Sequence, residues 1–305
     1  MREKNLENIF VIGDVHGCYY TLINLINKLP KNCDLVFVGD LCDKGNFSKD
    51  VIKFVIQNNY RCVKGNHEHL FEKYILDAVE KDTHSPWSYD KRYGGIACIK
   101  SYNNDLDIIK NHLEWIKQLP MYIQIGKYFI THGFALQYYE HRDNKEYYND
   151  FLLNRYYDGD TAQSKDVINI FGHCSFDEVV DGGDFFCIDT SCSYGKKLTA
   201  MQLATQKIFQ EPMDKRDSDY KAEPITLKEY DVYSENFESI ASLVIDSSSI
   251  YGKYDIVAND VLEAIVDKYG EDGKEELVRM HQRAQIFPKQ IKKVLGDEYV
   301  KDFKF

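Results

Sequence analysis

Three short apolar runs within the first 65 residues each end in a glycine or polar residues, and an amphipathic stretch follows each run. The runs are Asn8–Gly13, Asp34–Gly39 and Tyr60–Lys64, and the amphipathic stretches are Tyr19–Leu29, Lys49–Ile56 and Leu70–Val79. Apolar runs that alternate with helical periodicity predict βαβ units and a parallel sheet. A sheet of this kind needs helices on its faces, so the pattern confines the chain to an α/β fold.

The middle and second half of the chain favour strands. One helix is predicted over Asp107–Gln118, and a hairpin over Tyr122–Ile125 and Tyr128–Ile130. The further strand-like runs are Val167–Phe171, Glu178–Val180, Phe185–Ile188, Leu198–Leu203 and Lys207–Gln210. From about Arg216 the composition changes. We therefore predict a catalytic domain over residues 1–230 and a mostly helical C-terminal extension over residues 231–305.

Composition and charge exclude several classes of protein. The chain has 305 residues and a formal net charge of −11, so it has no general attraction for nucleic acid or anionic membranes. No stretch reaches the roughly 18 apolar residues of a membrane span. The N-terminal sequence lacks the apolar core of a secretion signal, and the eight cysteines form no CxxC pair. We therefore expect a cytoplasmic protein with reduced thiols and no membrane partner.

Polar side chains follow the three predicted parallel strands at their carboxyl ends. The motifs are GDVHG at 13–17, GDLCDKG at 39–45 and GNHE at 65–68, and His132 and His173 follow two later runs. Ligands of parallel sheets bind beyond these strand ends. Singly, such residues are typical of ordinary capped turns. Together, Asp14, His16, Asp40, Asn66, His132 and His173 form an oxygen and nitrogen ligand set that suits Mn²⁺ or Mg²⁺ as well as Fe or Zn.

These motifs, together with THG at 131–133 and GH at 172–173, resemble the calcineurin-like metallophosphoesterases. The resemblance is to the bacterial and phage branch of the serine/threonine protein phosphatases, and it extends from about Ile9 to about Gln210. It implies a four-layer α/β/β/α sandwich with two mixed sheets. It also implies two divalent metal ions, most readily Mn²⁺, that activate a hydroxide for direct attack on a phosphomonoester.

The resemblance assigns a role to each motif residue. Asp14 and His16 would hold one metal ion, Asp40 would bridge both, and the other predicted ligands would hold the second. His67 would be the general acid, and Asp43 would orient its imidazole.

The cations that bind phosphate depart from the family pattern. Lys44 stands where the family usually has arginine, and lysine lacks the bidentate fork of that side chain. The second phosphate-binding cation is expected to be Arg155, with Arg142 as the nearer competitor. Glu68 is interpreted as a helix N-terminal charge or a partner of the ligands rather than as a ligand itself.

The predicted substrate is a phosphorylated protein or a small phosphoester, and other functions remain open. A symmetrical dinucleoside tetraphosphatase is the nearest alternative, although those enzymes commonly carry aspartate at the position of Glu68 and lack Asp43. A nucleic-acid end phosphatase is disfavoured by the net charge of −11. A non-catalytic binding module should have lost a ligand or the acid, and none of these residues is missing.

Overall fold

The computed structural model describes residues 6–81, 83, 85–89, 93–156, 166–218 and 270–271. The chain divides into two compact units, Met1–Lys221 and Ala222–Phe305, and the first contains every element described below. The helical extension predicted over residues 231–305, and its boundary after residue 230, lie outside the described residues apart from 270–271. Both therefore remain predictions.

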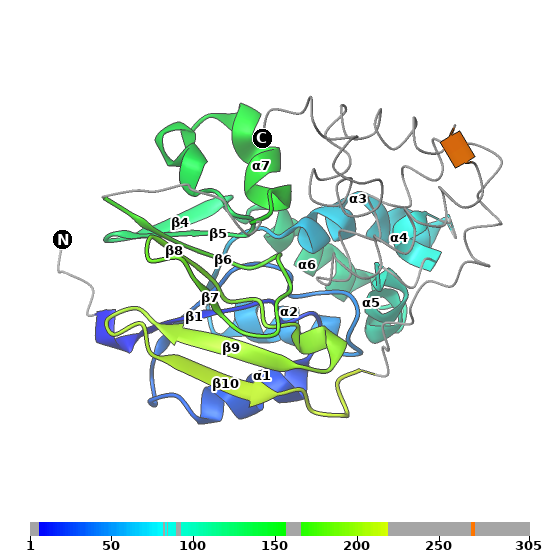
Figure 1. The fold of residues 1–305 in the computed structure, drawn as a ribbon. Coiled ribbons are helices and arrows are strands. Elements are labelled where there is room, and N and C mark those ends of the chain that lie inside the picture. Colours follow the sequence, from blue (N-terminus) through cyan, green and yellow to red (C-terminus); the bar gives the residue numbers. More distant parts are fainter. Residues whose placement is uncertain are drawn as a thin grey trace. The chain divides into compact units, whose positions relative to one another are not determined.

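Two mixed five-stranded sheets form the centre of the first unit (Figure 1). In the first sheet, β1, β2 and β3 are parallel, β9 pairs antiparallel with β1, and β10 pairs antiparallel with β9. These strands are Ile9–Ile12, Asp34–Phe37, Arg61–Cys62, Lys197–Gln202 and Ile208–Pro212. The predicted βαβ pattern is therefore confirmed at the start of the chain.

The second sheet has the order β4-β5-β6-β8-β7, with a parallel centre and antiparallel edges. Its strands in chain order are Tyr122–Ile125, Tyr128–Thr131, Ile168–Phe171, Val180–Asp181 and Phe185–Cys187. The predicted hairpin is confirmed, with Ile125 opposite Tyr128 in the register. Gly126 takes a φ of +56°, a left-handed conformation that glycine adopts without a steric penalty.

Helices flank both sheets. The α-helices α1 to α7 are Tyr19–Asn27, Ser48–Gln57, Asn66–Glu80, Pro86–Tyr89, Gly95–Tyr102, Leu106–Lys117 and Tyr148–Leu153. Short 3₁₀ helices lie at Leu6–Asn8, Leu136–His141, Lys145–Tyr147 and Cys192–Tyr194. Helix α3 begins four residues before the predicted start at Leu70, and α4 and α5 were not predicted.

Three apolar cores separate the layers and confirm the four-layer sandwich. Strand β1 shows how the layers arise, since all four of its residues are buried. Phe10 and Ile12 pack toward the helices that cover the first sheet, whereas Ile9 and Val11 pack into the core shared by the two sheets. A third core lies around Phe129 and the other aromatic residues on the far side of the second sheet, beneath α7 (Figure 1). Alternating side chains of a strand point to opposite faces, so burial of both faces requires a layer on each side.

The eight cysteines all lie in the described part of the chain, and each is a free thiol. Seven of them are buried, and Cys33 is half-buried. Among the described residues, no helix combines the length and apolar character needed to cross a membrane.

The segment that carries Asp217 caps the N-terminus of α1. This helix has no side-chain cap of its own at Cys18. Instead, the Asp217 carboxylate accepts hydrogen bonds from the Tyr20 and Thr21 amides at 2.8 and 2.7 Å and from the Thr21 hydroxyl at 2.6 Å. The Asp217 carbonyl also accepts a bond from the Asn46 amide at 2.7 Å. One aspartate therefore caps a helix from 196 residues away and ties it to the turn after β2.

Replacing Asp217 with alanine should weaken this cap. We expect Asp217→Ala to lower the free energy of unfolding by about 1–2 kcal/mol, as loss of an N-cap does elsewhere. Urea denaturation of the full chain measures the change. Asp177→Ala, which removes an exposed carboxylate paired with Lys196, should leave the midpoint unchanged. Equal effects of the two substitutions would contradict the cap.

Candidate functional site

The predicted site residues meet at the carboxyl ends of strands from both sheets. Asp14 and His16 follow β1, Asp40 follows β2, and Asn66 begins α3 directly after β3. From the second sheet, His132 and His173 follow β5 and β6. The fold therefore brings all of the predicted metal ligands to one edge of the sandwich, as expected for parallel strands.

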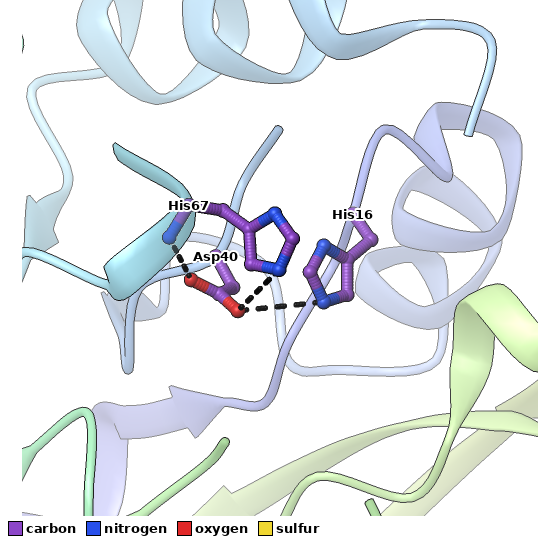
Figure 2. Close-up of side chains that lie close together, drawn as sticks. All are labelled: His16, Asp40 and His67. Carbon is purple, nitrogen blue, oxygen red and sulfur yellow. Dashed lines mark hydrogen bonds and ion pairs between the residues drawn. The ribbon is translucent and has the colours of Figure 1, made fainter. Parts of the chain in front are cut away.

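Asp40 lies close to three histidines, His16, His67 and His132, and Figure 2 shows the first two beside its carboxylate. Its Oδ2 atom is 3.4 Å from Nε2 of His16 and 3.9 Å from Nε2 of His67. Its Oδ1 atom is 3.3 Å from Nε2 of His132 and accepts a 3.0 Å hydrogen bond from the His67 amide. Oδ2 thus faces His16 and His67, whereas Oδ1 faces His132, so the two oxygens of Asp40 lie near different members of the predicted ligand set.

The neighbourhood of His132 supplies a test of whether these residues suit a cation. Nδ1 of His132 lies 2.8 Å from the Val38 carbonyl, which can only accept, so it carries the proton of the ring. Burial lowers the pKa of His132 to about 4, so the ring is neutral at pH 7. Nε2 therefore presents a lone pair to Asn66 Oδ1 at 2.8 Å and to Asp40 Oδ1 at 3.3 Å. The ring therefore has no proton to place between Nε2 and these two oxygens, and a metal ion fits between the three atoms.

A buried carboxylate extends the acceptor cluster. Asp14 accepts a hydrogen bond from the His173 amide at 3.1 Å. Burial, together with repulsion from Asp189 and Asp40, raises the pKa of Asp14 well above its usual range. Potential ligand atoms of Asp14, Asp40 and His132 lie within 4.8 Å of one another, as do those of Asp40 with His16 and His67. Divalent cations would offset this buried negative charge, so the donor set fits the two ions that the sequence predicts.

Glu68 holds the turn that presents Asp40. Its carboxylate is fully buried and accepts hydrogen bonds from the amides of Asp40, Leu41 and Gly65 at 2.7, 2.8 and 2.9 Å. Asp40 itself has a φ of +52°, a left-handed conformation that costs energy for a residue other than glycine. The three bonds explain how that conformation persists. Glu68 thus supports the ligands and does not project toward them, which agrees with its interpretation from the sequence.

His67, Asp43 and Trp87 form a hydrogen-bonded row beside Asp40. Nδ1 of His67 lies 2.6 Å from Oδ2 of Asp43, and the Trp87 indole donates to the same oxygen at 2.7 Å. Burial raises the pKa of Asp43 to about 7, against a lowering by the Trp87 hydrogen bond, and burial lowers that of His67 to about 3. Both shifts disfavour charge on these side chains, as expected for groups that are enclosed away from water.

Two cations lie at the site. The Lys44 ammonium is 2.9 Å from Nε2 of His16 and 4.7 Å from the centre of the Tyr194 ring. Arg155 is buried and close enough to His67 and His173 to lower their pKa values, after the larger effect of burial. Arg142 instead donates to the Tyr139 carbonyl at 2.9 Å and stacks on that ring. Of the two predicted arginines, the structure places Arg155 near the cluster.

Sequence reasoning missed three residues around the site. Trp87 lies in a short polar stretch without periodicity, and nothing local links it to Asp43. Cys98 of α5 lies with Cys42 and Asp43 in a buried group whose ligand atoms are within 4.8 Å of one another. Asp189 follows β8 and acts on Asp14 through its charge. Asp189 had the clearest signal, since it also follows an apolar run.

Comparison with known proteins identifies a relative named as a serine/threonine phosphatase and another named as an asymmetrical tetraphosphatase, whereas the alternative that the sequence leaves open is the symmetrical kind. A protein of Anoxybacillus flavithermus named bis(5'-nucleosyl)-tetraphosphatase PrpE (asymmetrical) is 25% identical over 237 residues, which cover 66% of this chain and 93% of that protein. Serine/threonine-protein phosphatase 2 of Escherichia coli is 28% identical over 209 residues, with 64% and 93% covered. A crystal structure described as a candidate diadenosine tetraphosphatase shares the fold, with a TM-score of 0.50, 19% identity and coverage of 69% and 96%.

The family model for calcineurin-like phosphoesterases matches residues 7–201. This match spans both sheets from β1 to β9 and includes all of the residues that surround Asp40. The chain therefore belongs to the calcineurin-like phosphoesterase family.

Proposed function

We propose that the protein is a metal-dependent phosphomonoesterase that removes phosphate from phosphoserine and phosphothreonine side chains. The observation that carries this proposal is the Asp43–His67 pair beside Asp40, because it places a proton donor next to the acceptor cluster. An alkoxide leaving group, as in phosphoserine, needs such a donor. The similarity to serine/threonine-protein phosphatase 2 of Escherichia coli supports the same substrate class.

The proposed metal ligands are the residues that surround Asp40. Asp14 and His16 would hold one divalent ion, and Asn66, His132 and His173 the other, with Asp40 shared. When bound, such a pair of ions supplies an activated hydroxide and polarises a phosphoryl oxygen. The mixed oxygen and nitrogen donors suit Mn²⁺ best, and they also accommodate Fe, Zn or Mg²⁺.

Three further side chains would bind the phosphate group and protonate the leaving group. Lys44 and Arg155 supply the positive charge that a phosphate dianion requires. His67 delivers a proton from Nε2 to the departing oxygen, while its Nδ1–H group stays hydrogen-bonded to the Asp43 carboxylate. The free thiols agree with a cytoplasmic site of action, which we propose on that basis.

A second candidate is the hydrolysis of dinucleoside tetraphosphates. The similarity to the Anoxybacillus flavithermus tetraphosphatase favours it. Glu68 and Asp43 disfavour the symmetrical tetraphosphatases, which commonly differ at both positions, but the matched relative is of the asymmetrical kind. A nucleic-acid end phosphatase is disfavoured by the net charge of −11, and a silent module by the complete set of ligands and acid.

The two candidates are separated by one assay. A phosphoserine peptide and diadenosine tetraphosphate are incubated in parallel with the protein, with and without Mn²⁺, and phosphate and nucleotide products are measured. We expect Mn²⁺-dependent phosphate release from the peptide. Nucleotide products from the dinucleotide alone would replace the phosphatase proposal with the second candidate. No product from either substrate by metal-loaded protein would refute both.

Substitution of His67 tests the general acid. His67→Asn should lower kcat on a phosphoserine peptide by about 10²–10⁴-fold, the usual contribution of a general acid. The loss on 4-nitrophenyl phosphate should be much smaller, because nitrophenolate leaves without a proton. His69→Asn, on the same helix, provides the control. Equal losses on the two substrates would show that His67 is not the acid.

Substitution of Glu68 tests the support of Asp40. Glu68→Gln places an amide group where the carboxylate accepts three backbone bonds, and we expect metal affinity to fall by about 10–100-fold. Calorimetric titration of the metal-free protein with Mn²⁺ measures this. Glu80→Gln, at the exposed end of α3, should bind Mn²⁺ like the unmodified protein. Unchanged affinity in Glu68→Gln would contradict the role of this turn.

A further inference from the structure

The Asp43 carboxylate receives both of its N–H hydrogen bonds on a single oxygen. His67 and Trp87 each contact Oδ2, at 2.6 and 2.7 Å. The other oxygen, Oδ1, is buried and has no hydrogen-bond partner in the described part of the chain. The thiols of Cys42 and Cys98, which are weak donors, lie with this carboxylate in one buried group. The orientation of this carboxylate therefore depends on the imidazole and the indole together.

We propose that Trp87 is a positioning residue for His67, acting through Asp43, and this rests on the proposed role of His67 as general acid. The indole N–H donates to Oδ2 of Asp43 and holds this oxygen in place, so that Nδ1 of His67 can donate to it. With Nδ1 fixed, the ring plane is fixed, and Nε2 is aimed at the acceptors around Asp40. Without the indole, the carboxylate has one strong donor and can rotate, so the ring loses its alignment.

The surroundings of Trp87 make the indole a rigid support. It is 1% exposed, stacks on Tyr74 at 6.4 Å and meets Phe71 edge-on at 6.3 Å. Both aromatic partners belong to α3, whose first turn carries His67. On the opposite side, a Cβ atom at Gly95 would lie 2.6 Å from the indole ring, so only glycine fits there. The same helix therefore holds the acid and packs against the residue that positions it.

The segment that carries Trp87 contacts the second motif at another point. The Gly94 carbonyl accepts a 3.1 Å hydrogen bond from the Lys44 amide. Lys44 has a φ of +60°, so its backbone needs such a partner to hold a left-handed conformation. Helices α4 and α5 thus fix Asp43 through its side chain and Lys44 through its backbone. They belong to the catalytic machinery even though no motif marks them.

The substitution Trp87→Phe removes the N–H group and keeps an aromatic ring in the packing. Loss of one hydrogen bond to a charged acceptor should lower kcat on a phosphoserine peptide by about tenfold. The rate on 4-nitrophenyl phosphate should change by less than about twofold, because that leaving group needs little help from an acid. KM for both substrates and the bound metal content should stay the same.

Two further variants isolate the positioning role. Trp115→Phe changes the other tryptophan of the chain, in α6, and should leave both rates unchanged. In a His67→Asn background, Trp87→Phe should cause no further loss, since a positioning residue has nothing left to position. Equal losses on the two substrates, or full additivity with His67→Asn, would overturn the proposal.

An independent measurement does not require turnover. The chain has two tryptophans, so a ¹⁵N-labelled sample gives two indole N–H signals, and Trp87→Phe identifies the one that it removes. That signal should move in Asp43→Asn, while the Trp115 signal stays in place. If the unmodified protein hydrolyses neither phosphomonoester, the proposed function fails. The contact between Trp87 and Asp43 is then judged by this signal alone, and an unmoved signal overturns it.

Discussion

The three hydrogen bonds that Glu68 accepts from the Asp40, Leu41 and Gly65 amides support the whole site. They join the turn after β2 to the start of α3, two segments that carry different parts of the chemistry. Asp40 takes its left-handed conformation in this turn, and His67 lies in the first turn of α3. Because the Glu68 carboxylate holds both segments, Asp40 and His67 are fixed in position relative to each other.

The electrostatics of the site follow from burial. Asp14 and Asp40 lie at 2% exposure in a region where their mutual repulsion is poorly screened. The same burial lowers the pKa values of the four histidines of the site, His16, His67, His132 and His173. Repulsion within such a cluster of acceptors and lone pairs is unfavourable, and cations bound among them would offset it. A protein with this interior gains folding free energy when it binds them.

The sequence predicted the parallel core and the ligand cluster because both depend on local patterns. Apolar runs such as Asn8–Gly13 show their strand character directly, and parallel topology places the residues after them at one edge. The start of α3 could not be located, since two of the three hydrogen bonds that Glu68 accepts come from amides 28 and 27 residues away in the sequence. Spacing alone could not decide whether Arg142 or Arg155 is the second phosphate-binding cation. The fold separates them, because Arg142 lies on the ring of Tyr139. Trp87 reaches Asp43 only through tertiary packing, which no periodicity reveals.

The cap that Asp217 provides for α1 has a consequence for how this unit can be joined to other sequence. The segment that ends at Ser218 is part of the fold, because it completes a helix near the N-terminus and anchors Asn46 beside the second motif. A truncation placed directly after β10 would keep every strand of the two sheets. It would still remove the hydrogen bond from the Asn46 amide to Asp217, which holds the turn that carries Asp43 and Lys44. The shortest fragment that keeps the site intact therefore includes Asp217 beyond the last strand, and a fusion partner should be attached after that residue.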